Sequence, residues 1–508
     1  MLLFATVLQA CSEATPAPPV DSGTGPIDGV RIRVSDDARA VVNAHPAGTT
    51  FIFETGIHRL TAPITPRTGD TFVGDTDAIL NGSQLLTSFN REGDLWVATG
   101  QTQQGWRHPG AYCESADSRC LYPENLYLDD TPLHHVTNLN AVESGTWFFD
   151  YDNDRIYFAD DPTGKKVETS VTDYAFHSDA DDVTIRDLTI EKFANYAQRG
   201  VILSRVFHRT HQTYGHHWVI ENNLIQLNHG AGITAGHGAR IINNRVLRNG
   251  HIGINGGWGR NTLVEGNEIA YNNWAGFRWT WEAGGAKWYY SDGLVVRNNH
   301  VHHNVGPGLW TDIDTINTLY EHNLVEHNTA VGIFHEISYA ATIRHNMVRY
   351  NGIGPGYEQH VYVFGSGILI SSSSDVTVYR NVLQGNWGGI AALQSNRGVG
   401  QHGTYHVRNL HVHDNDVEMT YWEDGYSGSG TPTGVASMTG LFRAGGPTDI
   451  WDEEANNRFE GNRYTITSGT SEHWHWQGSR RDFTTWQALG NDQTGQLCTT
   501  APTVMACN

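Results

Sequence analysis

Short runs of alternating apolar and polar residues recur along most of this chain, and many of them turn at an asparagine or a glycine. Residues 239–246 (ARIINNRV) and residues 261–269 (NTLVEGNEI) are two examples. Alternation with a period of two predicts β-strands with one buried face. Segments this short, and this rich in Asn, Gly and β-branched residues, disfavour paired helices. The pattern predicts an all-β chain built from short strands.

The strands belong to an internal repeat with a basic step of 21 to 24 residues and longer steps where segments are inserted. A repeat of this length with one short apolar strand per copy is typical of a solenoid. We expect a right-handed parallel β-helix with stacked Ile, Val and Leu inside. Asparagine suits its corners, because it tolerates left-handed backbone and can bond to its equivalent on the next coil. The glycine–apolar pairs are Gly232-Ile233, Gly253-Ile254, Gly276-Phe277, Gly308-Leu309, Gly332-Ile333, Gly367-Ile368 and Gly389-Ile390, and the asparagines in phase with them are Asn223, Asn244, Asn267, Asn299, Asn323, Asn346, Asn381 and Asn415.

Breaks in the repeat divide the chain into parts. Residues 28–88 contain strand-like runs and are expected to form the N-terminal coils. Residues 89–168 lack the repeat, and their short strands and Asp- and Asn-rich turns predict an inserted antiparallel β-sandwich-like module. The main β-helix with the site is expected at residues 169–465. Residues 466–508, which include a short capped helix, are expected to cover the open end of the solenoid.

The first 27 residues and the cysteines indicate export. Leu8-Gln9-Ala10-Cys11 resembles the lipobox of a bacterial lipoprotein signal, and residues 12–27 have the composition of a flexible tether. If Cys11 carries lipid, the remaining four cysteines form two close pairs, which predicts two disulfide loops and an oxidising compartment. We expect an exported protein of the bacterial surface, outer membrane, periplasm or medium, linked to a membrane through Cys11 alone. The pairs are Cys113 with Cys120 and Cys498 with Cys507.

Composition restricts the partners. The chain has 33 Lys and Arg against 54 Asp and Glu, a net charge of −21, and it has no basic run. Such a surface repels nucleic acid and anionic polymers, which favours a neutral sugar as substrate. The 16 Trp and 21 Tyr suit carbohydrate, because aromatic rings pack against the apolar faces of sugar rings. We therefore expect a carbohydrate partner and no nucleic acid.

Two carboxylates occupy the same position in successive copies of the repeat. Asp312 and Glu336 each lie four residues after the glycine, so both side chains should point outward from adjacent coils. Adjacent parallel strands lie about 4.8 Å apart, and retaining glycosidases hold their two carboxyls about 5–5.5 Å apart. Like charges on neighbouring strands are unfavourable unless they serve a purpose. The pair predicts a double displacement, with one carboxylate as nucleophile and the other as acid and base.

Side chains near the pair are candidates for contacting the substrate. Trp310 and Phe334 should desolvate the acid partner and raise its pKa. Arg278, expected on the preceding coil, is a candidate for keeping the nucleophile ionised. Two insertions, in the steps from Gly276 to Gly308 and from Gly332 to Gly367, are expected to wall the site. Further candidate substrate-binding residues are Glu282, Trp288, Tyr289, Asp314, His335 and His360.

The region around the two acids resembles a known enzyme family. The segments 308–312 (GLWTD) and 334–338 (FHEIS) are similar to the catalytic region of β-helix glycosidases of glycoside hydrolase family 120, the β-xylosidase type. The resemblance implies a right-handed β-helix with an inserted β-sandwich. It further implies Asp312 as the nucleophile and Glu336 as the acid/base. Ile313-Asp314 after the first acid and His335 before the second depart from the family's pattern, so xylose does not follow from the resemblance.

Other interpretations stay open at this stage, because the fold itself does not decide function. The acids could be ordinary solvated surface residues. A metal site built from Asp312, Asp314, His335 and Glu336 is disfavoured, because His335 should point away from the acids; no cofactor is expected, although structural calcium is compatible. A polysaccharide lyase or epimerase acting on uronates would use Arg278 or Lys287. A non-catalytic glycan-binding solenoid is the third alternative.

Overall fold

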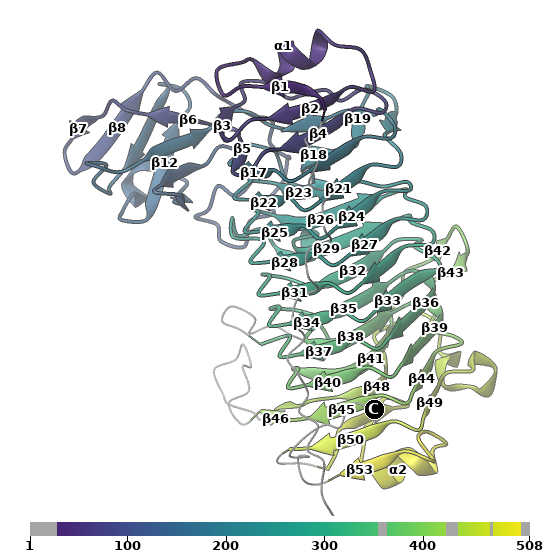
Figure 1. Ribbon diagram of the computed structural model, residues 1–508. Coiled ribbons are helices and arrows are strands. Elements are labelled where there is room, and N and C mark those ends of the chain that lie inside the picture. Colours follow the sequence, from purple (N-terminus) through teal and green to yellow (C-terminus); the bar gives the residue numbers. More distant parts are fainter. Residues whose placement is uncertain (1–27, 354–362, 423–434, 468–470, 499–508) are drawn as a thin grey trace, which may run out of the picture.

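The computed structural model describes residues 28–353, 363–422, 435–467 and 471–498. It is a parallel β-helix in which three long sheets wind around a common core, so the predicted all-β solenoid is confirmed (Figure 1). Sheet A has 13 strands, from β1 (Val30–Ile32) to β49 (Arg458–Glu460). Sheet B also has 13, from β3 (Gly56–Arg59) to β53 (Gln496–Cys498).

Sheet C, with 12 strands, carries the candidate site. One coil runs from β32 in sheet C through β33 (Thr318–Glu321) in sheet A to β34 (Leu324–Glu326) in sheet B, and β35 begins the next coil. The strands of sheet C are β15 (Phe176–His177), β18 (Gly200–Leu203), β23 (Ala231–Thr234), β26 (Ile252–Gly257), β29 (Gly284–Tyr289), β32 (Leu309–Asp312), β35 (Ile333–Glu336), β38 (Ser366–Ser371), β41 (Gly388–Gln394), β48 (Thr439–Arg443), β51 (Trp474–Trp476) and β52 (Ser479–Arg481).

The repeated glycine–apolar pair has a physical cause in sheet C. The apolar side chain points into the core, where Leu309 and Ile333 are fully buried and pair in register. The glycine before it lies against the next coil: a Cβ on Gly308 would approach the carbonyl oxygen of Gly332 to 2.7 Å. Any side chain at this position would therefore push adjacent coils apart.

One copy of the repeat differs from the prediction. The strand that pairs with β32 is β29, which aligns Ala286 with Leu309, so the copy is Gly285-Ala286 and not Gly276-Phe277. Phe277 instead packs in a small cluster with Cys120 on the outer side of the solenoid. The sequence pattern missed this copy because alanine is a weaker apolar signal than the phenylalanine of the insertion. As a consequence, the outward residue of this coil is Lys287 rather than Arg278.

The predicted asparagine ladder is confirmed at the corner between sheets A and B. Asn323 donates from Nδ2 to Asn346 Oδ1 at 2.9 Å and to the carbonyl of Val296 at 2.9 Å. Its own Oδ1 accepts from both the backbone and the side-chain amides of Asn299, at 3.1 and 3.0 Å. Each asparagine thus bonds both neighbouring coils. Because the side chain of each asparagine satisfies backbone groups of the preceding coil, the ladder fixes the register of the stack.

The inserted module consists of two small sheets packed around their own core of Trp147, Phe149 and Ile156. In Figure 1 it projects beside the N-terminal coils. It begins at β6, a few residues before the boundary expected from the sequence, because β6 pairs with β14. The strands are β6 (Ser83–Leu86), β7 (Asn90–Glu92), β8 (Leu95–Thr99), β9 (Leu126–Leu128), β10 (Thr131–Pro132), β11 (His134–His135), β12 (Thr146–Asp150), β13 (Arg155–Phe158) and β14 (Val167–Ser170).

Buried polar contacts hold this module against the solenoid. The buried ammonium of Lys192 contacts Asp130 and Glu168 of the module. Tyr127 donates from Oη to the carbonyl of Leu227 at 2.6 Å. Since unpaired charges are costly to bury, these contacts fix how the module sits. The long loop between β8 and β9 also contacts the solenoid, where Nε2 of the buried His229 lies 2.8 Å from the carbonyl oxygen of Cys120.

The cysteine predictions are tested in part. The Cys113–Cys120 disulfide is present in the β8–β9 loop. Cys11 and Cys507 lie outside the described residues, so the lipid anchor and the second disulfide stay predictions. Among the helices of the described ranges, none is long and apolar enough to cross a membrane.

The C-terminal end carries the expected capped helix. Asp482 accepts a hydrogen bond from the backbone of Thr485 and caps α2 (Phe483–Ala488), while α1 (Ala38–Asn43) lies at the other end of the chain. Trp486 of α2 is fully buried and packs edge-on against Phe459 of the last coil of sheet A. The helix therefore covers apolar surface at the end of the solenoid.

Replacing one ladder asparagine should destabilise the fold measurably. Asn323→Ala leaves the amides of Asn299 without their acceptor and the carbonyl of Val296 without its donor, all in buried positions. We expect the free energy of unfolding to fall by about 3 kcal/mol in urea titrations followed by circular dichroism. Asn396→Ala, at an exposed position, is the control and should leave the transition unchanged. Equal stability of the two variants would contradict a structural role for the ladder.

Candidate active site

Asp312 and Glu336 end two adjacent strands of sheet C and face outward together. The register that pairs Thr311 with His335 sets the two acids side by side on neighbouring coils. Strand alternation turns Thr311 and His335 inward, where Thr311 Oγ1 lies 2.7 Å from His335 Nδ1. Both acids are nearly enclosed, with Asp312 6% and Glu336 8% exposed. Two adjacent buried carboxylates require nearby positive charge.

Lys287 supplies this charge from the preceding coil. Its Nζ lies 2.7 Å from Asp312 Oδ2 and 3.1 Å from Glu282 Oε1. The ammonium also lies 3.8 Å from the centre of the Trp310 ring, a cation–π contact. Burial by itself would lower the pKa of Lys287, but the charges of Asp312 and Glu282 outweigh it and raise that pKa above the ordinary value. Lys287 is therefore a permanent cation beside Asp312.

Glu336 has a different electrostatic environment. Burial raises the pKa of its carboxyl, and the charge of Asp312 raises it further. Arg397, whose guanidinium contacts Glu336 Oε1, and Lys287 act in the opposite direction without cancelling the rise. The two neighbouring acids therefore differ: Asp312 is ion-paired with a buried lysine, while Glu336 holds a proton more readily than an ordinary glutamate.

Trp310 and Phe334 cover the inner side of the pair, as expected. Their rings stack with centres 5.2 Å apart, next to each other on the outer face of sheet C. Both are almost completely buried by Val331, Leu369 and other apolar side chains. Trp310 therefore contributes by excluding water from the acids and by contacting Lys287, and it offers little ring surface to a sugar.

Asp314 and Glu282 position other parts of the site. Asp314 Oδ1 accepts from Tyr405 Oη and from the backbone amide of Gln401, both at 2.8 Å. These contacts hold the hairpin of β42 (Val399–Gly400) and β43 (Gly403–Thr404), which follows directly after Arg397. Glu282 is bound by Lys287 and, at 2.9 Å, by Gln198 Nε2.

Two predicted substrate contacts are wrong. Trp288 and His335 are almost completely buried in the interior of the solenoid, because strand alternation turns them inward beside Lys287 and Glu336, which point outward. Burial lowers the pKa of His335 to about 3, so this ring is neutral. Neither side chain can touch a substrate, and the inward direction of His335 also rules out the considered metal site. In the described ranges, no group of three or more His, Cys, Asp or Glu is arranged to hold a metal.

The three remaining candidates have different positions. Tyr289 points outward and is aligned with Asp312 on the adjacent strand, and its contact with substrate stays a prediction. The side chain of Arg278 is exposed in the insertion before β29, and its backbone amide donates to Tyr112. Its expected role beside the nucleophile falls to Lys287. His360 lies outside the described residues.

Sequence reasoning named Lys287 only as a base for a lyase and did not name Arg397. The role of Lys287 could have been found by allowing alanine after the repeat glycine, because Gly285-Ala286 then places Lys287 in line with Trp310. Arg397 lies 61 residues after Glu336, in an exposed loop beyond β41. No local sequence pattern predicts its contact with Glu336.

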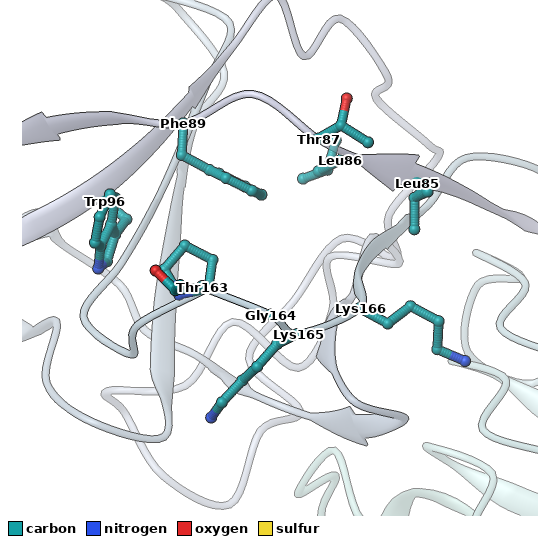
Figure 2. A pocket seen from close by; sticks show the side chains of 10 residues that line it. Leu85, Leu86, Thr87, Phe89, Trp96, Thr163, Gly164, Lys165 and Lys166 are labelled. Carbon is teal, nitrogen blue, oxygen red and sulfur yellow. The ribbon is translucent and has the colours of Figure 1, made fainter.

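Two hollows of the surface lie away from the paired carboxylates. One, of about 650 Å³, lies on the inserted module between Phe89, Trp96 and Lys165 (Figure 2). Another, of about 550 Å³, lies on sheet A near Thr342 and Arg344. Neither is lined by the paired carboxylates. The candidate site is therefore identified by its charges and register and not by a deep cavity.

Comparisons with known proteins agree with the fold. A family model described as right handed beta helix region matches residues 210–382. The chain is similar to XylC, solved in complex with xylose, with 15% identity over 84% of this chain and 80% of that chain and a TM-score of 0.59. A structure described as a glycoside hydrolase follows, with 10% identity, coverage of 81% and 89%, and a TM-score of 0.44. A search of curated proteins finds no match. At these identities the likeness shows a right-handed β-helix.

Removing the buried lysine should destabilise the protein in a pH-dependent way. Lys287→Met leaves Asp312 and Glu282 without their cation, and we expect the free energy of unfolding at neutral pH to fall by about 3 kcal/mol. In mild acid the deficit should shrink, because the carboxyls then bind protons and carry no uncompensated charge. Thermal unfolding at both pH values measures the difference. Arg278→Met, which removes an exposed cation nearby, should change neither value.

Proposed function

We propose that this protein is a retaining glycoside hydrolase in which Asp312 is the nucleophile and Glu336 the acid/base. The observation that carries the proposal is the pair itself: two buried, outward-facing carboxylates on adjacent coils, with opposite electrostatic environments. The strand spacing of about 4.8 Å fits the separation that double displacement needs and is shorter than inverting enzymes require. The fold shared with XylC and the resemblance at residues 308–312 and 334–338 support the proposal.

The two steps follow from the positions of the acids. In the first, Asp312 attacks the anomeric carbon while Glu336 gives its proton to the leaving oxygen, which breaks the glycosidic bond and forms a glycosyl ester. In the second, Glu336 takes a proton from water, and the resulting hydroxide displaces Asp312 from the anomeric carbon. Two inversions at that carbon give net retention of configuration.

Electrostatics assigns the roles in this order. Lys287 balances the charge of Asp312 before the attack, and the raised pKa of Glu336 keeps a proton available for the leaving group. The negative charge of Asp312 is one of the causes that raise the pKa of Glu336. Asp312 loses this charge when it becomes an ester. The pKa of Glu336 then falls, so this residue gives up its proton more easily and its carboxylate can act as the base for water. A single pair therefore serves both steps.

The same geometry disfavours a lyase or epimerase. Such an enzyme needs an unprotonated base, and Asp312 and Glu282 raise the pKa of Lys287, so it keeps its proton. Arg278, the other residue considered, is exposed and makes no ion pair within the described residues. An ultraviolet-absorbing unsaturated uronide among the products would contradict the proposed hydrolase. A binding solenoid without activity would release no reducing sugar at all.

The compartment and substrate are also proposals. The Cys113–Cys120 disulfide supports export into an oxidising compartment. Oligosaccharides derived from plant or algal polysaccharides, xylan among them, are the first substrates to screen. Released reducing sugar from such a panel, measured on the full chain, gives the direct test of activity.

The stereochemical outcome tests the double displacement. Proton NMR of the first product should show the anomeric configuration of the substrate, and Asp312→Ala should lower kcat/KM at least about 1,000-fold. Azide should partly rescue this variant by attacking in place of the carboxylate, giving a glycosyl azide. Asp292→Ala, an exposed aspartate of the same turn region, is the control and should keep full activity. An inverted product would exclude the mechanism.

The pH profile tests the role of Glu336. Because its pKa is raised above 4.5, kcat/KM should fall with rising pH only beyond the ordinary glutamate range, as the acid loses its proton. Arg397→Met removes a neighbour that lowers this pKa, so the basic limb should move to higher pH. Glu336→Ala should lose that limb and should affect poor leaving groups far more than activated aryl glycosides. Arg260→Met, at an exposed position, is the control and should leave the profile in place; a limb that does not move in Arg397→Met would contradict the assignment.

A further inference from the structure

Two arginines flank β18 of sheet C, on a coil nearer the N-terminus than the acids. Arg199 immediately precedes β18, and Arg205 begins β19 (Arg205–Phe207). Arg205 is only 4% exposed and Arg199 is half-buried. Neither forms an ion pair with a described carboxylate, and the Nε of each is buried without a hydrogen-bond partner. A buried guanidinium without an anion is energetically costly. These two arginines could therefore bind an anion that the described residues do not supply.

Aromatic rings hold both guanidinium groups in place. Arg199 lies 3.4 Å from the centre of the Phe207 ring, and Arg205 lies 4.8 Å from that of Tyr214, in β20 (Gln212–Tyr214). Stacking of this kind fixes the plane of an arginine and leaves its N–H groups available at the edge. Burial lowers the pKa of Arg199 from its ordinary value, and the positive charge of the neighbouring Arg205 also lowers it.

The arginines adjoin the carboxylate site through Tyr289. Arg205 Nη1 donates to Tyr289 Oη at 3.2 Å, and Tyr289 is aligned with Asp312 on the adjacent strand. The Tyr289 ring lies across Gly257 of the intervening strand, where a Cβ would overlap the ring. Glycine at this position thus gives the ring its place. Tyr289 therefore links Arg205 to the strand position beside Asp312.

Exposed aromatic side chains lie near the two arginines. Trp106, from the β8–β9 loop of the inserted module, is 53% exposed, and its ring lies 4.5 Å from that of Tyr196. Phe207 is also exposed on one side. Rings that keep an open face beside polar donors are suited to packing against the apolar face of a sugar. The inserted module therefore contributes one wall of this region.

We propose that Arg199 and Arg205 form a subsite for an anionic group, a carboxylate or a sulfate ester, on a sugar near the one that is cleaved. This inference rests on the proposed glycosidase function, because it takes the Asp312–Glu336 pair as the point of cleavage. The planar guanidinium groups match the two oxygens of such an anion. The net charge of −21 repels long polyanions, so the substrate carries isolated acidic units on an otherwise neutral chain. The expectation of an entirely neutral substrate is revised accordingly.

The decisive experiment compares each acid with its uncharged ester on the unmodified protein. The probes are methyl glucuronoside and methyl galacturonoside, the methyl ester of each, and methyl glucoside 6-sulfate, with affinities measured by ligand-observed NMR. We expect at least one anionic probe to bind about tenfold more tightly than its neutral counterpart, methyl glucoside serving for the sulfate. Preference for a uronoside or for the sulfate identifies the anion. Equal binding of charged and neutral probes, or no binding of any anionic probe, would overturn the proposal.

Variants locate the effect and separate it from catalysis. Arg205→Met and Arg199→Met should each abolish the preference for the charged probe, while Arg240→Met on sheet A, an exposed arginine, should keep it. If Arg205→Met fails to fold by circular dichroism, Arg199→Met and the ester comparison on the native chain still decide. The binding measurement does not depend on turnover. If the protein binds the anionic probes more tightly but cleaves no glycoside, the anion subsite is supported and the proposed glycosidase function is contradicted. If cleavage depends on Asp312 but charged and neutral probes bind equally, only the anion subsite is contradicted.

Discussion

The in-register stacking of coils is the constraint on which the rest of the structure depends. Each ladder asparagine bonds to the asparagines of both neighbouring coils, and each repeat glycine allows the coils to approach closely. A shift of one residue would turn Asp312 inward and Thr311 outward, because strand side chains alternate. The ladder therefore does more than stabilise the fold. It determines which side chains meet on the outer face of sheet C.

Charge on that face is arranged so that no carboxylate of the site is buried alone. Lys287 lies between Asp312 and Glu282, and Arg397 contacts Glu336 from the other side. The lysine is buried more deeply than the arginine, so the two acids receive unequal compensation. In the proposed mechanism, this inequality is what distinguishes the nucleophile from the acid/base. Arg205, which bonds to Tyr289, and the neighbouring Arg199 add positive charge that has no carboxylate partner among the described residues.

Segments distant in the sequence complete the region around a rigid core. The inserted module brings Trp106 near β18, and Asp314 fixes the hairpin that follows Arg397. Both are held by buried hydrogen bonds or ion pairs to the solenoid. Loops anchored on a rigid scaffold can differ in sequence without disturbing the catalytic register. In this protein, the coils position the acids, and the inserted segments supply neighbouring groups that a substrate would meet.

The sequence by itself determined the solenoid, the ladder from Asn223 to Asn415, the Cys113–Cys120 disulfide and the adjacency of Asp312 and Glu336. These features are local or strictly periodic, so the repeat carries them. The sequence pattern misplaced one copy of the repeat, at Gly276-Phe277, and therefore predicted Arg278 at the position that Lys287 occupies. Trp288 and His335 were assigned to a substrate although alternation turns them inward. Only the tertiary structure decided which cations contact the two acids and that Arg199 and Arg205 lie close together. These contacts depend on inserted segments, whose conformation the repeat does not predict.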